Sequence, residues 1–530
     1  MELIMSKFVR IITTGVVICI INQSVMADQF SNTKTIDPYF GQYWDMDLAA
    51  AGSNESQPGD RLGESLSSGD FNGDGYPDLA IGSPKRNLFV NDAGAVLILY
   101  GNQSGATNTS SVLQFSNVVQ EGEQFGTSLI SGDFNNDGYD DLVVGAPYKD
   151  FTNQANVVFE DTGAVYVYYG SSIGLSNTGL FIDADDNQQI GTDRQAFAEF
   201  GFALASGDFN GDDFDDLVVS APGQNFNQAS NAGAIFIYYG GQVSSPLMGL
   251  DPLIRDSISQ SSPNVSGSSE TGDLFGFSLA AGDFNNNGYD DLAIGVPYET
   301  VGNLTWAGLV QVFYGNSLGL IDDDQIWEQS DITGALTESI DVFGFSLAVG
   351  DINGDGNDDL LIGAPFEDLG NIVDAGAAHY IPGSGIGLTT TGSLTFSQQT
   401  AGIFGTAETN DRFGYSLGVA DLNVDGFAEA IVGVPFETNN GSESGFIHVL
   451  PGLSTGIDFA ESSYLEGEQA GDNFGFAINQ SENYFGPSLV VSASGKTSGD
   501  GDIDAGSVSE IFYLNPDIIF KDGFEFNLGK

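Results

Sequence analysis

The sequence predicts an all-β fold, a seven-bladed β-propeller of four-stranded antiparallel blades, and three observations lead to this prediction. Seven units of similar sequence follow one another along the 530-residue chain. Within each unit the apolar runs are short and are bounded by Gly, Asn, Asp and Pro, which is the pattern of strands and turns. Glycine supplies 72 residues, about twice its ordinary share, and this favours turn-rich β structure. Repeated four-stranded units protect their edges when they close into a ring.

Each unit is expected to contain four strands, which we name A to D. Strand A begins at a Phe-Gly or Leu-Gly pair and leads into an acidic loop, strand B ends at a Gly-Ala-Pro-like triplet, and strand C has the pattern G-A-x-x-x-x-Y-G. A more polar strand D follows. The pairs are Leu62-Gly63, Phe125-Gly126, Phe200-Gly201, Phe275-Gly276, Phe343-Gly344, Phe413-Gly414 and Phe474-Gly475. The triplets lie at 82–84, 145–147, 220–222, 295–297, 363–365, 433–435 and 492–494.

A calcium-binding β-helix is the rival repeat fold, but its repeat is about nine residues long. The first residues of the acidic loops are separated here by 63 to 75 residues, which excludes the β-helix.

The ends of the chain define the expected domain organisation. Residues 1–27 are expected to be an export signal, because Lys7 and Arg10 precede a short apolar run and Ala27 ends a small-residue cleavage pattern. A retained anchor is the alternative. The propeller is expected to span 28–514 and a tail 515–530. Residues 42–52 resemble a strand D and are expected to close the seventh blade, with a loose N-terminal tail as the alternative. The predicted location is the extracellular space or the cell surface, and the periplasm is the alternative.

The composition excludes several classes of function. The formal net charge is −60, so nucleic acid and anionic lipid are poor partners, whereas metal cations and basic surfaces are good ones. The one cysteine, Cys19, lies in the expected signal, so no disulfide is expected after cleavage. Membrane insertion is not expected. The two histidines, His379 and His448, occupy the same position in two equivalent strands C and are expected to pack.

Six of the acidic loops have the spacing of a cation site. Oxygen atoms at loop positions 1, 3, 5 and 9, with the backbone carbonyl at position 7, can surround one hard cation, and Gly at position 6 allows the sharp bend. We therefore expect five to six Ca²⁺ ions. The candidate ligands are Asp70, Asn72, Asp74, Tyr76 and Asp78; Asp133, Asn135, Asp137, Tyr139 and Asp141; Asp208, Asn210, Asp212, Phe214 and Asp216; Asp283, Asn285, Asn287, Tyr289 and Asp291; Asp351, Asn353, Asp355, Asn357 and Asp359; and Asp421, Asn423, Asp425, Phe427 and Glu429.

The loops are not equivalent. Asp213 replaces the glycine of loop three, Asn287 removes one charge from loop four, and Glu429 brings a longer arm to loop six. Unit seven has 482–487 in place of the loop and is expected to bind no metal. The alternative for all six loops is a set of Asx turns that bind no ion. Magnesium fits the flexible oxygen-only loops less well than calcium, and zinc lacks its usual ligands.

The Phe-Gly pair, the acidic loop and the Gly-Ala-Pro triplet together resemble the FG-GAP repeats of the integrin alpha-chain propeller and its bacterial relatives. The resemblance runs from about residue 44 to 514. It implies a propeller that binds metal in its loops and that serves adhesion or recognition, since in integrin alpha chains the face opposite the metal loops contacts the partner subunit and the ligand.

The expected function is a secreted calcium-binding adhesion or recognition module for a protein or carbohydrate ligand. In an antiparallel blade the A–B loops and C–D turns share one face, the A–B face, and the B–C and D–A loops share the other, the B–C face. Longer loops on the B–C face carry aromatic candidates for ligand contact. They are Tyr148, Phe226, Tyr298, Trp306, Phe366 and Phe436. A packing role is the alternative for Trp306. The alternative function is a secreted glycan-active hydrolase or lyase with its site at the propeller axis, although the sequence has no catalytic motif.

Overall fold

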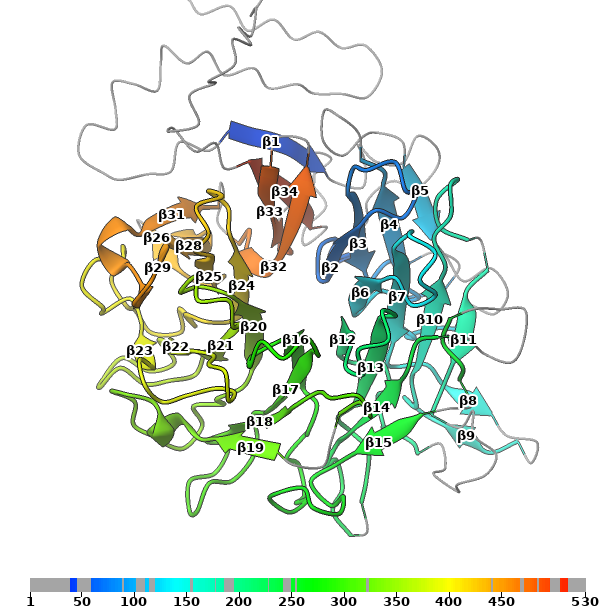
Figure 1. Cartoon of the computed structure of the whole chain (residues 1–530), viewed down its shortest axis with the longest axis horizontal. Helices are drawn as coiled ribbons and strands as arrows, with labels where there is room; N and C mark the ends of the chain where they lie inside the picture. The colour runs from blue at the N-terminus through cyan, green and yellow to red at the C-terminus, as the bar shows by residue number, and fades with distance from the viewer. Residues whose placement is uncertain are drawn as a thin grey trace, which may run out of the picture.

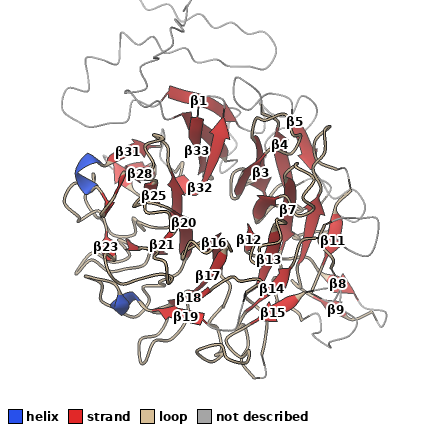
Figure 2. Ribbon diagram, in the orientation of Figure 1, coloured by secondary structure: helices blue, strands red, loops and turns tan. Residues whose placement is uncertain are grey.

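A computed structural model of the chain describes residues 39–44 and 59–512, apart from 88–89, 102–109, 114–119, 153–155, 177, 185–194, 227, 242–248, 253–254, 321–323, 440–441, 468–470, 484–485 and 496–505. Seven four-stranded antiparallel sheets stand around a central axis, which confirms the predicted propeller (Figure 1). Figure 2 shows that strands dominate. The helices of the described part are two short 3-10 turns, η1 (Gln329–Asp331) and η2 (Phe459–Glu461).

Strand A is the innermost strand of every blade, and each sheet runs outward in the order A, B, C, D. Blade one contains β2 (Leu66–Gly69), β3 (Asp78–Ser83), β4 (Ala95–Leu99) and β5 (Ser110–Leu113). Blade two contains β6 (Leu129–Gly132), β7 (Asp141–Ala146), β10 (Ala164–Tyr168) and β11 (Leu180–Ile182). Blade three contains β12 (Leu204–Gly207), β13 (Asp216–Ala221), β14 (Ala234–Tyr238) and β15 (Asp256–Ile258). Blade four contains β16 (Ser278–Gly282), β17 (Asp291–Val296), β18 (Leu309–Phe313) and β19 (Asp324–Trp327).

Blade five contains β20 (Ser346–Gly350), β21 (Asp359–Ala364), β22 (Ala377–Ile381) and β23 (Leu394–Phe396). Blade six contains β24 (Ser416–Ala420), β25 (Glu429–Val434), β28 (Phe446–Leu450) and β31 (Ser463–Glu466). Blade seven contains β32 (Phe474–Asn483), β33 (Gly486–Ala493), β34 (Ser507–Phe512) and β1 (Tyr39–Trp44). Three small hairpins complete the set: β8 (Phe151–Thr152) with β9 (Val158–Phe159), β26 (Thr438–Asn439) with β27 (Ser442–Glu443), and β29 (Gly452–Leu453) with β30 (Gly456–Ile457).

The outer strand of blade seven comes from the N-terminal side of the chain. β1 pairs antiparallel with β34, from Tyr39 opposite Phe512 to Trp44 opposite Val508. The strand therefore lies at 39–44, earlier than the 42–52 that the sequence favours, and residues 45–52 lie outside the described part. In this arrangement the first and last described strands of the chain are neighbours in one sheet (Figure 1).

The core lies between blades. Strands B and C of blades one to six are buried along their whole length, as in β7 and β10, because the neighbouring blades cover both faces of each sheet. Val143 and Val165 of blade two, for example, pack in one cluster with Leu217 and Phe236 of blade three. Burial of this apolar surface is the main stabilising contribution to the ring.

The two glycines of the repeat motif meet across five of the seven blade junctions, and blades three and seven have serine as the first residue of the triplet. An added Cβ at Gly145, the first residue of a triplet, would lie 2.2 Å from the carbonyl oxygen of Gly201 in the next blade. Ser128 Oγ donates a 2.7 Å hydrogen bond to the same oxygen. Blade three has Ser220 in place of that glycine and Ala203 in place of that serine, and there Ala203 N donates to Ser220 Oγ. The motif is therefore a packing device between blades.

Candidate functional site

Each of the six acidic loops on the A–B face forms the same hydrogen-bonded turn. In loop two, Asp133 accepts hydrogen bonds from the backbone N–H of Asp137 at 3.0 Å and of Gly138 at 2.8 Å, and Asp137 accepts one from Tyr139 N at 3.1 Å. The corresponding bonds form in the other five loops. The side chains at positions 1 and 5 are therefore held by backbone hydrogen bonds, and in five of the six loops both are carboxylates crowded into one turn.

The acid at position 9 is the most buried of the candidate ligand side chains in each loop. Asp141 Oδ1 accepts a 2.8 Å hydrogen bond from Gly170 N, at the end of strand C. Burial, and then the charges of Asp133 and Asp137, raise the pKa of Asp141 to about 8. Burial likewise raises the pKa of Asp78 and Asp359 to about 7, and of Asp216, Asp291 and Glu429 to about 8. A nearby cation would reverse this preference for the neutral acid.

The donor set fits a hard divalent cation. Its side-chain atoms are carboxylate and amide oxygens, which calcium prefers, and Asn135 Oδ1 at position 3 is buried without a hydrogen-bond partner. The residues that would hold the ion are those at positions 1, 3, 5 and 9 of each loop, with the carbonyl of position 7. An ion bound there would supply the positive charge that compensates the crowded carboxylates.

The three unusual loops keep the same turn. Asp213 takes the place of glycine with φ of 68°, so this aspartate accepts the left-handed geometry. Asn287 Oδ1 accepts from Tyr289 N as an aspartate does elsewhere. Glu429 accepts from Leu422 N and from Asn423 Nδ2, both at 2.7 Å. In loop six the exposed Val424 stands at position 4 with φ of 57°, where the other loops have Gly or Asn.

Sequence reasoning missed the acid at position 8, which joins neighbouring loops. Asp215 Oδ2 of loop three accepts a 2.7 Å hydrogen bond from Asp133 N of loop two, and Asp215 N donates to Asp133 O. The same link joins loops one and two, three and four, and four and five through Asp140, Asp290 and Asp358. Loop six has Ala428 at this position and loop one has Pro77. An acidic position 8 in four consecutive units was the available signal.

The B–C face holds an arc of aromatic rings around the axis. The residue after the Phe-Gly pair is aromatic in blades three to seven, and the rings of successive blades lie 5.2 or 5.3 Å apart at tilts of 44° to 47°. We call these residues the aromatic arc: Phe202, Phe277, Phe345, Tyr415 and Phe476. All five are half-buried. The sequence analysis did not single them out, although an aromatic residue follows the glycine in five of seven units.

Four of the six predicted ligand-face residues extend this arc outward. Tyr298, Phe366 and Phe436 contact Phe277, Phe345 and Tyr415 at ring distances of 5.9, 6.1 and 5.5 Å. Trp306 packs edge-on against Tyr298 at 5.8 Å and is 51% exposed. The guanidinium of Arg412 lies over both Phe366 and Phe436, at 4.6 and 4.9 Å.

The other two predicted residues lie apart from these contacts. Phe226 packs against the core between blades two and three. Tyr148 is half-buried, and burial with the charges of Glu199 and Asp161 raises its pKa to about 12.

Trp306 occupies a position that is conformationally unfavourable for it. Its φ is 55°, and the equivalent positions hold Asp92, Asp161, Asn231 and Asp374, all with φ between 48° and 53°. Asp and Asn tolerate this left-handed geometry better than a tryptophan does.

Both histidines are fully buried. His379 Nδ1 lies 2.9 Å from Thr395 Oγ1, and His448 lies among the rings of Phe413 and Phe446. Burial lowers the pKa of His379 to about 3 and of His448 to about 4, so both are neutral at physiological pH.

These features define a seven-bladed β-propeller with a repeated acidic A–B loop. The FG-GAP repeat matches residues 62–99, 125–168, 200–238, 275–313, 343–381 and 413–450, one match in each of blades one to six. The chain is an FG-GAP repeat protein that is similar to integrin alpha chains.

Relatives show this similarity over part of their length. Integrin alpha pat-2 of Caenorhabditis briggsae is 31% identical over 65% of this chain and 26% of its own length. Integrin alpha-5 of Xenopus laevis is 33% identical over 44% of this chain and 20% of its own length. Phosphatidylinositol-glycan-specific phospholipase D of Rattus norvegicus is 35% identical over 32% of this chain and 19% of its own length. The matched region thus spans about a quarter or less of each of these relatives.

Among solved structures, the Dos1 propeller aligns with a TM-score of 0.42 and 12% identity, over 90% of this chain and 96% of its own. Rhamnogalacturonan lyase YesW aligns with a TM-score of 0.40 and 11% identity, over 89% of this chain and 75% of its own. Neither likeness bears on function. Within the described residues, no helix is long and apolar enough to cross a membrane.

Proposed function

We propose that this chain is a secreted calcium-binding β-propeller that acts as an adhesion or recognition module and binds a protein or glycan ligand on its B–C face. The observation that carries the proposal is the aromatic arc with its outer ring residues. Half-buried rings on a rigid frame provide a large contact area with little conformational entropy to lose on binding. Trp306 supports the same conclusion, because it is exposed at a position where Asp or Asn is conformationally better.

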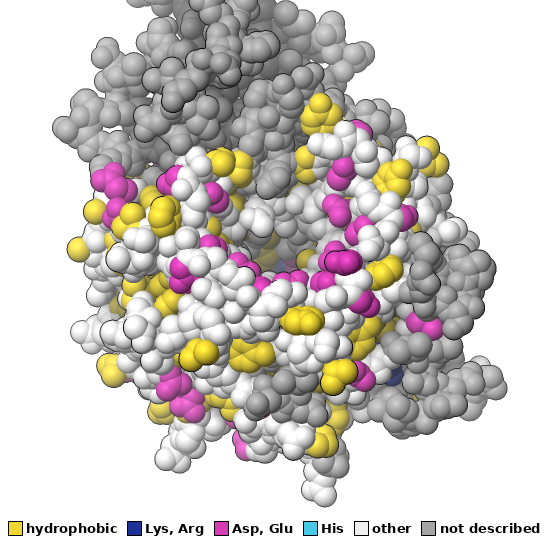
Figure 3. Space-filling view, in the orientation of Figure 1, with side chains coloured by type: hydrophobic (Ala, Val, Ile, Leu, Met, Phe, Trp, Pro, Cys, Tyr) yellow, Lys and Arg dark blue, Asp and Glu magenta, His cyan; other side chains and the backbone are white. Residues whose placement is uncertain are grey.

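Calcium binding by the loops gives the A–B face its part in this function. The hydrogen-bonded turns hold the ligand atoms in place, and the oxygen-only donor set matches the ion. Acidic side chains also gather around the centre of the face seen in Figure 3. The proposed ligands are the thirty residues given by the loop spacing, and the proposed ions number five to six. Export through residues 1–27 would bring the chain to a calcium-rich environment.

The test is a binding screen with matched variants. Labelled protein is applied to immobilised polysaccharides and to immobilised extracellular-matrix proteins, and any binding is remeasured with Trp306→Asp. Aspartate is the residue at this position in blades one, two and five, so the variant keeps the backbone geometry. The control is Ile386→Asp, which changes a 93% exposed residue in a C–D turn on the opposite face.

We expect Trp306→Asp to weaken binding by about tenfold or more, as for a central aromatic contact, and Ile386→Asp to leave it unchanged. Equal effects of the two variants would contradict a ligand site on the B–C face. Release of new sugar ends from a bound polysaccharide would instead favour the catalytic alternative.

A further inference from the structure

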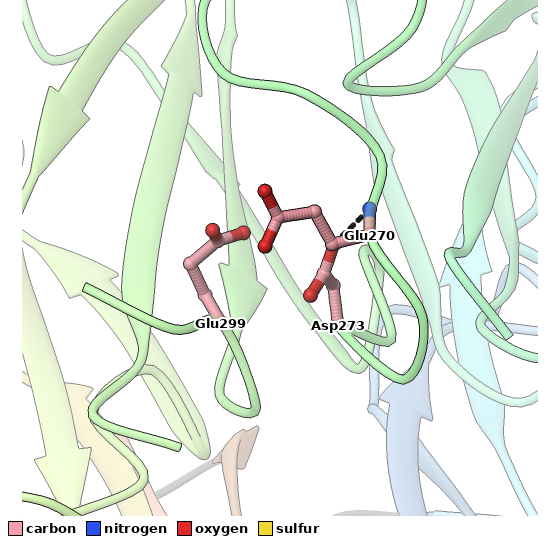
Figure 4. A group of neighbouring side chains, drawn as sticks. All are labelled: Glu270, Asp273 and Glu299. Carbon is pink, nitrogen blue, oxygen red and sulfur yellow. Dashed lines mark hydrogen bonds between the residues drawn. The ribbon is translucent and has the colours of Figure 1, made fainter. Parts of the chain in front are cut away.

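Blades four, five and six each carry three acidic residues at equivalent positions of the B–C face. In blade four these are Glu270, Asp273 and Glu299, whose ligand atoms all lie within 4.8 Å of one another. Figure 4 shows the carboxylates of Glu270 and Asp273, from the D–A loop, facing that of Glu299, from the B–C loop. The backbone N–H of Glu270 donates to Asp273. This cluster is separate from the A–B loops, which lie at the other ends of the strands.

The same three acids recur in the sequence of the next two blades, although among the described residues only the blade-four group has all its ligand atoms within 4.8 Å of one another. Glu338, Asp341 and Glu367 occupy the equivalent positions of blade five, and Glu408, Asp411 and Glu437 those of blade six. In both, the backbone N–H of the first glutamate again donates to the aspartate. We call the three groups the acid trios. Because the same turn recurs, each trio is a built feature of its blade junction.

A buried glutamine points into each acid trio. Gln260, Gln329 and Gln398, which follow β15, β19 and β23, are 2%, 0% and 5% exposed. Their Nε2 atoms donate to Glu299, Glu367 and Glu437 at 2.8, 2.6 and 2.6 Å. In all three the Oε1 atom is buried without a hydrogen-bond partner. A buried amide oxygen without a partner is unfavourable, so each amide has an oxygen available for a ligand beside the carboxylates.

In blades one and two, a basic side chain of the protein neutralises the acid at the equivalent positions. In blade one Asp60 forms a 2.8 Å ion pair with Arg86, and in blade two Glu123 forms a 2.6 Å ion pair with Lys149. The first position of the trio is Gln57 in blade one and Gln120 in blade two. Each of these two sets is therefore neutral, whereas each acid trio carries a formal charge of −3.

Blades three and seven follow the same rule. Blade three has three uncharged residues at these positions, Gln195, Ala198 and Gln224. Blade seven has Gln469, Asp472 and Lys496 in the sequence, again a neutral set. A positive charge thus accompanies the acid in three blades, no charge is present in one, and uncompensated acid is confined to blades four to six.

Burial makes the uncompensated charge costly. It raises the pKa of Glu299 to about 7, and burial together with the charges of Asp341 and Asp411 raises the pKa of Glu367 and of Glu437. Buried carboxylates are stable when paired with a cation, and a cation from solution can provide this pairing in the acid trios.

We propose that each acid trio, with its glutamine oxygen, is a binding site for a divalent cation of the calcium type, additional to the A–B loops. Calcium binds oxygen ligands at about 2.3–2.6 Å, so two ligands of one ion lie up to about 5 Å apart, and the 4.8 Å spread in blade four fits. The ion replaces the guanidinium of Arg86 and the ammonium of Lys149. The proposal concerns bound ions alone and does not depend on a ligand for the aromatic arc.

The test converts one acid trio into the neutral set of blade two. The double variant Glu338→Gln with Glu367→Lys gives blade five the Gln, acid and Lys pattern of Gln120, Glu123 and Lys149. Bound calcium is counted by equilibrium dialysis of the full chain at fixed free calcium. We expect about one ion fewer per chain, with a melting temperature in chelator that is unchanged or higher than that of the unaltered chain.

The matched control is Glu160→Gln with Glu443→Lys, which makes the same change of net charge at two exposed positions on the same face. It should leave the calcium count unchanged. Equal counts for the acid-trio variant and the unaltered chain would overturn the proposal and leave a proton shared by Asp341 and Glu367, whose carboxyls are hydrogen bonded, as the neutralising element. If the double variant does not fold, Glu367→Gln, which copies Gln224 of blade three, serves in its place. A count unchanged by that variant over the whole calcium range would overturn the proposal as well.

Discussion

Replacing Asp215 tests whether the position-8 acids tie neighbouring metal loops together. In Asp215→Ala, Asp133 N loses the carboxylate that it contacts at 2.7 Å, while the backbone bond from Asp215 N to Asp133 O remains. A hydrogen bond to a charged group contributes about 1.5–3 kcal/mol. Against this stands the cost of the carboxylate itself, since burial and then the charges of Asp133, Asp140 and Asp208 raise the pKa of Asp215.

The balance of these two effects should depend on calcium. With ions in the loops the neighbouring charges are compensated, so we expect Asp215→Ala to lose about 1–2 kcal/mol of unfolding free energy. At about 2.1 cal/mol/K of unfolding entropy per residue, a cooperative domain of this size would melt only about 1–2 °C lower. In chelator the loss should shrink, because removing an acid from a crowded cluster relieves repulsion.

The assay therefore needs a local reading beside calorimetry. Hydrogen exchange of the peptide that contains Asp133 reports the opening of this one amide, and it should accelerate in Asp215→Ala with calcium present. Asp215→Asn keeps an acceptor oxygen and should exchange at a rate close to that of the unaltered chain. Ala428→Asp should slow exchange at Asp351 by supplying the missing link in blade six. Identical exchange at Asp133 in all variants would refute the idea that position 8 joins the loops.

Four further predictions concern stability. Chelation should lower the melting temperature strongly, because ~10 mM calcium acting on sites with a dissociation constant of ~0.1 mM adds roughly 2.7 kcal/mol of stability per site. Asp351→Ala should remove part of the calcium-induced rise in melting temperature, and magnesium should reproduce little of that rise. Val424→Asn should stabilise by about 1 kcal/mol in urea unfolding, because it relieves a left-handed valine; no gain would contradict the assigned strain. The unaltered chain should lose up to about 1.4 kcal/mol of stability per pH unit as the pH falls from the ordinary histidine pKa near 6.5 toward the folded value of about 4 for His448. His448→Phe, which copies Phe236 of blade three, should abolish this loss, so its urea unfolding curves at pH ~5 and ~7.5 should differ less than those of the unaltered chain. Deletion of residues 28–52 should expose the edge of β34 and promote aggregation, measured by light scattering; a monomeric product of unchanged melting temperature would show that β1 is dispensable.

Repetition made much of this fold predictable from the sequence. The Phe-Gly pairs, loops and triplets are each ambiguous alone, but their common phase in seven units identifies the blades and the A–B junctions. The bounds of the outer strand of blade seven do not follow from the sequence pattern, because strands D are polar and short and the register of this one is set by backbone pairing with β34. The pattern therefore favoured 42–52, whereas β1 is Tyr39–Trp44.

Contacts between blades could not be predicted from the sequence of any single repeat unit. The position-8 acids and the aromatic arc each contact a neighbouring blade, so their partners are 61 to 82 residues away and no local pattern shows the contact. The acid trios were hidden for a similar reason, since Asp273 and Glu299 lie on different loops. Comparing the same position in all seven units would have revealed each of them as a column of like residues.

The aromatic and acidic features of the B–C face share one turn in blades four to six. Tyr298, Phe366 and Phe436 directly precede the glutamates Glu299, Glu367 and Glu437 after the triplet proline. An ion held by such a glutamate would therefore fix the turn that carries the outer ring, and loss of the ion would free that ring to move. In blades one and two the equivalent turn is fixed by Arg86 and Lys149, which no change in calcium can remove. Calcium would thus act on the two faces differently: on the A–B face it stabilises loops all around the ring, and on the B–C face it orders only the half that bears Trp306 and most of the aromatic arc.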